Sequence, residues 1–200
     1  MILGGVDNLT IELHPDFGNV INLQVLDLHG NFVESGLPDS MGNLLGLVEL
    51  NLAKCGLSGS IPSWIGNFVP LIELDLNDNL FTGTLPEGLY DLTNLEILRL
   101  ENQMNSLSGT LSTQIGNLVD LVDFRVSKSG LSGDLPEELS NLVNAERLHF
   151  EFNEFWGEIP EDLCSVETLK DLQADCDKGD VDCSCCTKCC SVKKGKCKEP

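Results

Sequence analysis

The sequence is poor in basic side chains and has no long apolar run. It carries 12 Lys and Arg against 32 Asp and Glu, a formal net charge of −20. Such a chain repels polyanions, which argues against nucleic acid or an anionic membrane as a partner. No stretch approaches the roughly 18 apolar residues of a membrane-spanning helix, so we expect no direct membrane insertion. The segment MILGGVDNLT lacks the basic and apolar regions of a signal peptide.

Cysteine is scarce through most of the chain and abundant at its end. Before Cys164 the sequence has only Cys55, whereas residues 183–190 read CSCCTKCC. The charge divides in the same way. Residues 1–174 carry 27 acidic and 6 basic side chains (net −21), and residues 175–200 carry 5 and 6 (net +1). We therefore treat 175–200 as a separate C-terminal cap.

Residues 23–174 consist of one internal repeat, the signature of a stacked architecture. Six full units begin at Leu23, Leu47, Leu71, Leu95, Leu121 and Ala145, and a partial seventh begins at Leu169. Five units have 24 residues and the fourth has 26. In each, L-x-x-L-x-L predicts a short strand with alternate side chains pointing inward. Because no unit can bury its apolar row alone, the pattern predicts a right-handed α/β solenoid with a parallel sheet on its concave face.

A small polar position follows each strand and can bond backbone groups where the chain turns out of the sheet. Stacking of the units would make these residues a structural ladder: Asn31, Cys55, Asn79, Asn105, Ser129 and Asn153. A glycine and a proline close the turn in most units, but Ser112 replaces the proline in the fourth.

The pattern L-x-x-L-x-L-x-x-N-x-L-x-G-x-[IL]-P resembles the plant-type extracellular leucine-rich repeat. That family includes ectodomains of receptor-like kinases and receptor-like proteins, and polygalacturonase-inhibiting proteins. The tail ADCDKGDVDCSCCTKCC resembles the ending of diatom leucine-rich-repeat proteins. The resemblance implies a non-catalytic recognition module, part of a receptor-like ectodomain. The alternative is a secreted inhibitor or a wall- or matrix-associated structural protein. The paired cysteines of the family's amino-terminal cap are absent from this sequence.

Residues 1–22 form a partial N-terminal unit. Counting 24 residues back from Leu26 reaches Ile2, so the chain starts inside a strand. Since a solenoid must hide the apolar face of its first unit, we expect missing sequence or another chain to cover this edge. The segment Asn8-Leu9-Thr10 is a sequon, which makes Asn8 a candidate glycosylation site.

The cysteines near the end are even in number and begin where the repeat stops. They are Cys164, Cys176, Cys183, Cys185, Cys186, Cys189, Cys190 and Cys197. A disulfide cap explains this position best, although the sequence cannot choose the pairing. A zinc or thiolate cluster and a redox centre are the alternatives, but the tail has no histidine and its vicinal pairs suit neither. Disulfides imply an extracellular or secretory location.

Strand positions of successive units align in rows about 4.8 Å apart. Arg99, Arg125 and Arg147 are the only arginines, and they lie on consecutive strands beside His149. We expect them to bind an acidic group of a protein, peptide or glycan ligand, because a guanidinium matches a carboxylate. The alternative is a solvated lattice of salt bridges that contributes little.

An acidic strip of Glu49, Glu73 and Asp75 is the second candidate ligand-binding surface. Glu49 and Glu73 would face each other at about the carboxylate spacing of a retaining glycosidase, but an open sheet cannot desolvate one of them. No Ser–His–Asp or Cys–His group falls on adjacent rows. An ice-binding surface would need a flat threonine-rich row, and the available row contains Asp134 and Glu158. The sequence therefore predicts no enzyme, no cofactor and no metal.

Overall fold

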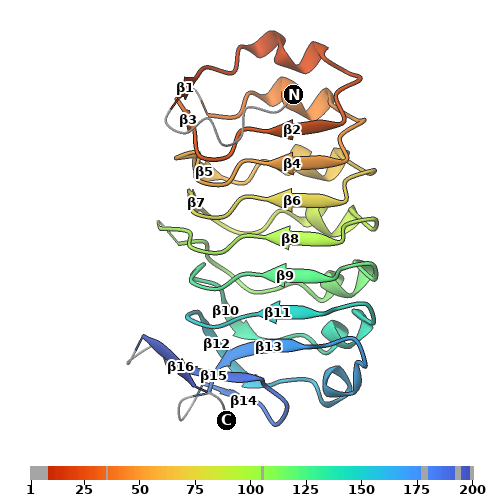
Figure 1. Cartoon of the computed structure of the whole chain (residues 1–200), viewed down its shortest axis with the longest axis vertical. Coiled ribbons are helices and arrows are strands. Elements are labelled where there is room, and N and C mark those ends of the chain that lie inside the picture. The colour runs from red at the N-terminus through yellow and green to blue at the C-terminus, as the bar shows by residue number, and fades with distance from the viewer. Residues whose placement is uncertain (1–8, 35, 105, 177–179, 192–194, 199–200) are drawn as a thin grey trace.

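The computed structural model describes residues 9–34, 36–104, 106–176, 180–191 and 195–198. Asn8 and Asn105, the predicted glycosylation site and a predicted ladder residue, lie outside these ranges. The chain coils into a solenoid whose turns stack along one long axis (Figure 1). None of the helical segments in the described ranges combines the length and apolar character that a membrane crossing requires.

A nine-stranded sheet lines the concave face, with strand order β16-β15-β13-β11-β9-β8-β6-β4-β2 (Figure 1). The repeat supplies β2 (Val25–Asp27), β4 (Glu49–Asn51), β6 (Glu73–Asp75), β8 (Ile97–Arg99), β9 (Asp123–Arg125), β11 (Arg147–His149) and β13 (Asp171–Asp175). The cap adds β15 (Lys188–Ser191), parallel to β13, and β16 (Lys196–Lys198), antiparallel to β15. The predicted parallel sheet is thus confirmed and extends into the cap.

Alternate side chains of the repeat strands point into the core, as a period of two requires. Leu50 of β4 and the following Leu52 are fully buried, whereas Glu49 and Asn51 are partly exposed. The fifth and sixth units use aromatic residues at the inward positions. The rings of Phe124 and Phe150 meet edge to face with their centroids 5.9 Å apart. Aromatic pairs prefer this arrangement.

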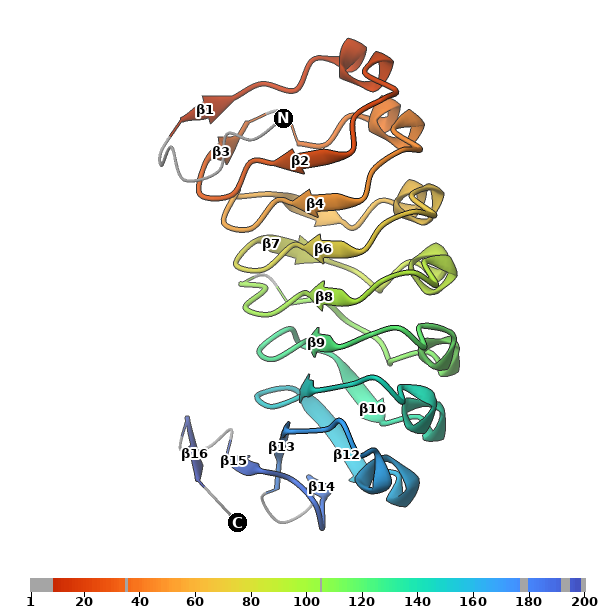
Figure 2. The same cartoon turned by 45° about the vertical axis from the view of Figure 1, so that its right-hand side comes forward.

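The side of the solenoid away from the concave sheet carries short 3-10 helices stacked in a column (Figure 2). They are η1 (Pro15–Asn19), η2 (Asp39–Asn43), η3 (Ser63–Asn67), η4 (Glu87–Asp91), η5 (Thr113–Asn117), η6 (Glu137–Asn141) and η7 (Glu161–Ser165). Five residues leave room for little more than one turn, which a 3-10 helix makes with fewer residues than an α-helix. Ser112, the departure from the repeat's proline, accepts the N–H of Gln114 through Oγ at 3.2 Å and so caps η5.

The turns approach closely along this column. A Cβ added at Gly66 would lie 2.6 Å from the carbonyl oxygen of Gly88 in the next turn. Short parallel pairs complete the back of the solenoid: β1 (Thr10–Ile11) with β3 (Phe32–Val33), β5 (Ser58–Ser60) with β7 (Leu80–Thr82), and β10 (Ser132–Asp134), β12 (Glu154–Glu158) and β14 (Val181–Asp182) in one sheet. Gly66 in η3 is therefore needed for close stacking, whereas the turn glycine of the same unit, Gly59, adopts a positive φ of 83° and has no neighbour within 4 Å of an added Cβ.

Buried polar side chains hold successive turns together. Asn79 accepts the N–H groups of Cys55 and Leu57 through Oδ1 at 3.1 and 3.0 Å. Its Nδ2 donates to the carbonyl oxygens of Leu52 and Leu76, both at 2.9 Å. Such bonds satisfy backbone groups that have no partner in a strand. The side chain of one turn thereby completes the hydrogen bonding of the turn before it.

The other ladder positions behave in the same way. Asn153 accepts the N–H of Ser129 at 3.0 Å and donates to the carbonyl oxygen of Val126 at 2.7 Å. Ser129 Oγ donates to the carbonyl oxygen of Leu100 at 2.7 Å. Cys55 Sγ donates to the carbonyl oxygen of Leu28 at 3.3 Å, and Asn31 Oδ1 accepts the N–H of Leu9 at 3.1 Å. These five predicted residues therefore lie in one continuous ladder.

In the fourth unit the ladder position is held by Gln103 rather than by the predicted Asn105. Gln103 accepts the N–H of Phe81 at 3.2 Å and donates to the carbonyl oxygen of Leu76 at 2.9 Å. It is the third residue after Leu100, the same spacing as Asn79 after Leu76. The two extra residues of this unit come after Gln103. The ladder position is therefore set by its distance from the strand and not by the presence of an asparagine.

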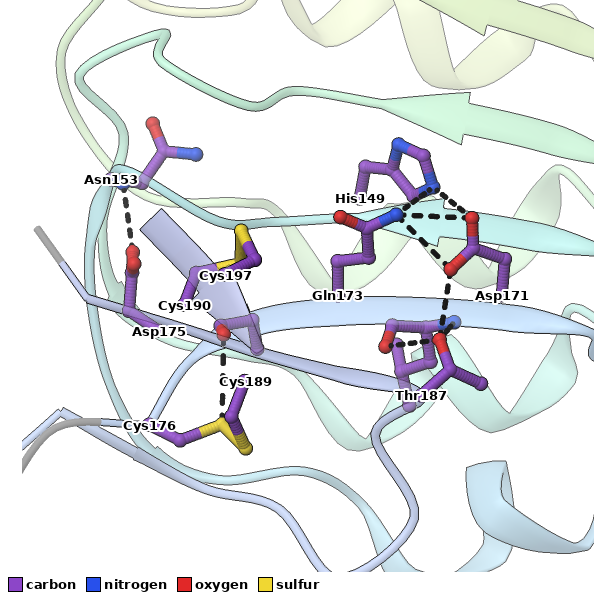
Figure 3. Close-up of a disulfide and its surroundings, with 12 residues drawn as sticks. His149, Asn153, Asp171, Gln173, Asp175, Cys176, Thr187, Cys189, Cys190 and Cys197 are labelled. Atoms are coloured by element: carbon purple, nitrogen blue, oxygen red, sulfur yellow. Dashed lines mark hydrogen bonds and ion pairs between the residues drawn. A yellow bond between two sulfur atoms is a disulfide. The ribbon is translucent and has the colours of Figure 1, made fainter. Parts of the chain in front are cut away.

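The eight cysteines predicted as a cap form four disulfides. The pairs are Cys164–Cys185, Cys176–Cys189, Cys183–Cys186 and Cys190–Cys197. Two of them lie around β15, as Figure 3 shows. Cys55 is a buried free thiol. The cap also shares the solenoid's core, because Val181 and Cys186 are buried in the same apolar cluster as the repeat leucines. The last repeat is therefore covered by a covalently braced segment.

Candidate binding surface on the concave sheet

The concave sheet brings the three arginines together around one aspartate. Strand pairing aligns Arg99 with Arg125, and Arg125 with His149. In the neighbouring row Asp123 pairs with Arg147. The rows expected from the repeat length are therefore present, and Asp123 lies among the three guanidinium groups.

Asp123 is completely buried and receives several guanidinium contacts. Arg125 donates through Nε at 2.7 Å and through Nη2 at 3.0 Å, and Arg99 donates through Nη2 at 3.0 Å. Arg147 Nε lies 3.4 Å from the same carboxylate. Burial alone would raise the pKa of Asp123, but the hydrogen bonds from Arg125 and Arg99 hold it below its usual range. Asp123 is thus an internal anchor that fixes the arginines in place.

The three arginines differ in how completely they are paired. Arg99 also contacts Asp75 at 3.5 Å and Glu73 at 3.6 Å, and its side chain is 25% exposed. Arg125 forms a two-bond fork with Asp123. The Arg147 side chain is 38% exposed, and its shortest ion pair, 3.4 Å to Asp123, is longer than the shortest ion pair of Arg99 (3.0 Å) or of Arg125 (2.7 Å). Arg147 therefore has the most exposed side chain and the loosest pairing of the three.

His149 contacts the last repeat, and through Asp171 it is linked to the cap, whereas none of its hydrogen bonds or ion pairs in the described part of the chain joins it to the arginines. Its Nε2 lies 3.0 Å from Asp171 Oδ2 and 3.1 Å from Gln173 Nε2 (Figure 3). Thr187 of the cap donates to Asp171 at 2.8 Å. Burial would raise the pKa of Asp171, but hydrogen bonds from Thr187 and His149 lower it. His149 thus couples the concave face to the cap.

The acidic strip is partly neutralised by the arginine cluster. Glu49 pairs with Glu73, and Asn51 with Asp75, across β4 and β6. Burial raises the pKa of Glu73 and of Asp75, and Arg99 opposes both shifts. Glu49 makes no ion pair with any described residue within 4.0 Å. The strip and the arginines therefore form one charge-alternating surface rather than two independent sites.

Three carboxyl groups that are fully or partly buried in one row were not singled out from the sequence. Glu101, Glu151 and Asp175 each have one buried oxygen without a hydrogen-bond partner. Burial raises the pKa of Glu101 to about 7 and that of Asp175 to about 6, and it also raises the pKa of Glu151. The signal in the sequence was an acidic residue directly after the third inward position of the unit, where other units carry His29, Ala53, Asn77 and Ser127.

The described residues contain no group of three or more His, Cys, Asp or Glu side chains placed to hold a metal ion. The surface instead offers fixed guanidinium groups next to carboxylates on a stiff sheet. Its chemistry suits recognition of a ligand with an acidic group, because a guanidinium donates two parallel hydrogen bonds to a carboxylate.

Comparison with known proteins agrees with the repeat architecture. Residues 22–44, 46–68 and 70–92 match the Leucine Rich Repeat family. The leucine-rich-repeat ectodomain of the receptor kinase SOBIR1 from Arabidopsis thaliana is 31% identical, with a TM-score of 0.58, and the match covers 64% of this chain and 67% of that one. No curated protein sequence matches the chain significantly.

Two further solved structures are similar over most of this chain. The ectodomain of the Arabidopsis receptor kinase HAESA, in complex with an N-terminally extended IDA peptide hormone ligand, is 36% identical with a TM-score of 0.73. The match covers 84% of this chain but 27% of that one. A plant ice-binding protein is 26% identical with a TM-score of 0.72, and the match covers 91% of this chain and 56% of that one.

Proposed function

Because the chain belongs to the plant-type extracellular leucine-rich-repeat family, we propose that it is a non-catalytic recognition module, part of a receptor-like ectodomain. It binds a protein, peptide or glycan through its concave sheet. The four disulfides support an extracellular or secretory location, where such bonds persist. The HAESA ectodomain, crystallised with a peptide hormone, supports a peptide as the ligand class.

The observation that carries this proposal is the exposed side chain of Arg147 beside Arg125, which makes two hydrogen bonds to Asp123. Arg125 and Arg99 satisfy the buried Asp123, so Arg147 can turn toward a ligand without leaving that carboxylate unpaired. A carboxylate of the partner would accept two parallel hydrogen bonds from the guanidinium of Arg147. The acidic strip would repel any further negative charge of the ligand that came close to it. Long-range attraction does not help, because the protein's net charge of −20 repels an acidic ligand and salt screens the attraction of the arginines beyond about 8 Å.

Binding can be tested by selecting peptides from a random displayed library and measuring affinities of the selected peptides. We expect the selected peptides to contain a carboxylate that contacts the arginines. Arg147→Ala should then weaken binding by on the order of 2 kcal/mol, as at an interface hot spot. Arg147→Lys should recover only part of that loss, because it restores the charge without the fork. Arg125→Ala is expected to weaken binding similarly, but it also removes two bonds to Asp123.

The matched control is Glu137→Ala in η6, on the side away from the sheet, which should leave affinity unchanged. Equal binding of the selected peptides by the wild type and by folded Arg147→Ala and Arg125→Ala variants would move the site away from the arginines. The strip of Glu49, Glu73 and Asp75 would then be tested next with basic peptides.

The similarity to an ice-binding protein does not extend to a flat hydroxyl-bearing row. The aligned outward positions are Ser60, Thr84, Thr110, Asp134 and Glu158, and all of them are exposed. Two carboxylates at one end interrupt any threonine lattice. We therefore base the proposed function on the concave sheet.

A further inference from the structure

A row of exposed apolar side chains runs along one flank of the solenoid, where each 3-10 helix returns to the concave sheet. This edge is on the right in Figure 1. The members have exposed fractions of 61% at Ile21, 59% at Leu45, 56% at Val69, 44% at Val119 and 59% at Val143. Thr93 takes the same position in the unit between Val69 and Val119. We refer to these five apolar residues as the flank row.

The fold does not require apolar side chains at these positions. In the units after the first, the preceding residue, such as Phe68 before Val69 or Leu118 before Val119, is fully buried and supplies the core contact. The next residue points outward, and Thr93 shows that a polar side chain fits there. Single exposed apolar residues are ordinary, but an aligned series of them marks an interaction surface.

The backbone beneath the flank row is held in register. Asn94 donates to the carbonyl oxygen of Val69 at 2.9 Å, and Asn144 donates to that of Val119 at 3.0 Å. Thr168 Oγ1 donates to that of Val143 at 3.0 Å. Each bond ties one turn to the next, so the spacing of the row is fixed before a partner arrives, which lowers the entropic cost of binding.

The surroundings of the flank row are acidic. Asp91, Glu96 and Asp120 are exposed and lie within three residues of Thr93 or Val119 in the sequence. At the C-terminal end of the row, the amino group of Lys170 donates to Glu146 Oε1 at 2.7 Å, so its positive charge is already paired. A second chain of the same protein would bring another net charge of −20 to this edge, and an anionic membrane would likewise be repelled. A partner of opposite charge fits better.

The spacing of the row selects the shape of that partner. Neighbouring strands lie about 4.8 Å apart, so each turn of the solenoid presents one apolar side chain at about that interval. An α-helix presents an apolar residue about every 5.4 Å, whereas same-face residues of an extended strand lie about 6.8 Å apart. Five steps from Ile21 to Val143 span about 24 Å, or about 16 residues of helix.

We propose that the flank row binds an amphipathic, basic α-helix of a partner protein. The helix lies along the solenoid axis with one apolar stripe on the flank row. Lysine or arginine residues bordering that stripe contact Asp91, Glu96 and Asp120. This surface is separate from the concave sheet, so the protein has a ligand face and a partner face on adjacent sides.

The test uses synthetic peptides of about 16 residues with high helix propensity, the length that spans the row. One peptide carries leucine along a single helical stripe with lysines on both borders. A second has the same composition in scrambled order, and a third replaces the lysines by glutamate. Fluorescence anisotropy measures their affinities for the full chain. The patterned basic peptide should bind at least about tenfold more tightly than either of the others, and its affinity should fall as salt rises.

The protein variants separate apolar contact from charge. Leu45→Gln, Val69→Gln and Val119→Gln combined should reduce affinity for the patterned peptide by at least about tenfold. The matched control is Met104→Gln with Trp156→Gln, because these residues are 81% and 53% exposed but lie outside the flank row. Arg147→Ala should leave this affinity unchanged, so failure here and failure of the concave site are distinguishable.

Equal affinity of the patterned and scrambled peptides would mean binding by charge alone and would overturn the proposal. Unchanged affinity of the triple glutamine variant would overturn it too. Sedimentation velocity of the full chain tests whether a second copy of the protein occupies the flank row. A dimer that the triple variant abolishes would assign the flank row to a second copy of the protein instead of a helix.

Discussion

The repeat body, residues 23–174, and the C-terminal cap, residues 175–200, differ in what joins one segment to the next. In the body, buried side chains such as Asn79 and Asn153 bond the backbone of the preceding turn, and the described residues before Cys164 contain no disulfide. Four disulfides hold the cap: Cys164–Cys185 ties it to η7 of the body, Cys190–Cys197 joins β15 to β16, and the other two lie within the cap. Residues 23–174 carry 24 acidic and 6 basic side chains (net −18), and the cap carries 5 and 6 (net +1).

The difference follows from the number of neighbours that each segment has. A repeat buries its apolar row between two similar turns, so local side chains suffice. The cap has the last turn on one side only, and a segment of its size cannot build a core large enough to fold alone. Disulfides compensate by limiting the freedom of the unfolded chain. The cap therefore protects the open end of the body without contributing a repeat of its own.

Reduction of the disulfides should have the largest effect. Each bond removed from a small domain costs about 2 to 5 kcal/mol. We expect β15 and β16 to lose protection first, because their covalent bracing disappears, whereas β4 to β9 keep theirs. Hydrogen exchange with mass spectrometry, with and without reductant, measures the two regions separately. Equal loss of protection along the whole sheet would show that the cap and the body unfold as one unit.

The same sample can be used to count thiols. The non-reduced chain should weigh eight hydrogens less than the reduced one, and Cys55 should be its single free thiol. Burial raises the pKa of Cys55 to about 11, so alkylation should require unfolding, since the thiolate is the reactive form. Stoichiometric zinc with free cap thiols would contradict the disulfide assignment.

Removing one ladder side chain should have the next largest effect. Asn79→Ala leaves the N–H groups of Cys55 and Leu57 and the carbonyl oxygen of Leu52 without this partner, whereas the carbonyl oxygen of Leu76 still accepts from Gln103. At about 1 kcal/mol or more for each of the three groups, the loss should be on the order of 3 kcal/mol, measured by urea unfolding. Asn94→Ala is the matched control, because that exposed side chain makes one bond, to Val69. A similar loss of unfolding free energy for both variants would mean that the buried ladder contributes no more to stability than an exposed side-chain hydrogen bond.

A smaller loss is expected at the centre of the concave sheet. Asp123→Asn keeps the shape but leaves Arg99, Arg125 and Arg147 without their shared counter-charge. These guanidinium groups are partly exposed, so water offsets some of the penalty, and we expect a loss of about 2 kcal/mol. Glu146→Gln removes a peripheral partner of Arg147 and should have no measurable effect. No loss for Asp123→Asn would show that the arginines do not depend on this anchor.

The predictability of the body and of the cap from sequence differs for physical reasons. A unit length of 24 residues determines which strand positions align, so the rows containing Arg99, Arg125 and His149 follow from counting. Counting also gives Gln103 as the ladder residue, whereas matching by residue type leads to Asn105. The cysteine pairing depends on the path of the cap, which has no repeat to constrain it.

The candidate sites were predictable only in part. Register places Asp123 near the arginines. It does not determine the conformations of the long arginine side chains, and these conformations set which carboxylate each guanidinium contacts. That choice depends on burial, and it left Arg147 more exposed than Arg125. The flank row needed the structure as well, because the repeat specifies Phe68 as a core residue and does not restrict the outward Val69.

The smallest expected effect concerns pH. Burial raises the pKa of Glu101 from 4.5 to about 7 and that of Asp175 from 3.8 to about 6. The folded state therefore holds these protons more tightly than the unfolded chain. Their stabilising contribution is complete below the unfolded values and is lost as pH rises through the folded ones. Asp123 and Asp171 act in the opposite sense, because their pKa values are lowered and their contribution is lost at acidic pH below 3.8.

Thermal unfolding should therefore show rising stability from pH 8 to about pH 5 and falling stability below about pH 3.8. Glu101→Gln should flatten the first limb and raise stability at pH 8. Glu101 is partly exposed, so water reduces the expected gain to about 1 kcal/mol. Lower pH also relieves the general repulsion of a chain with net charge −20. Glu154→Gln, which removes one charge from an exposed site, measures that general term. If both variants flattened the limb equally, the effect would come from overall charge and not from the buried carboxyl group of Glu101.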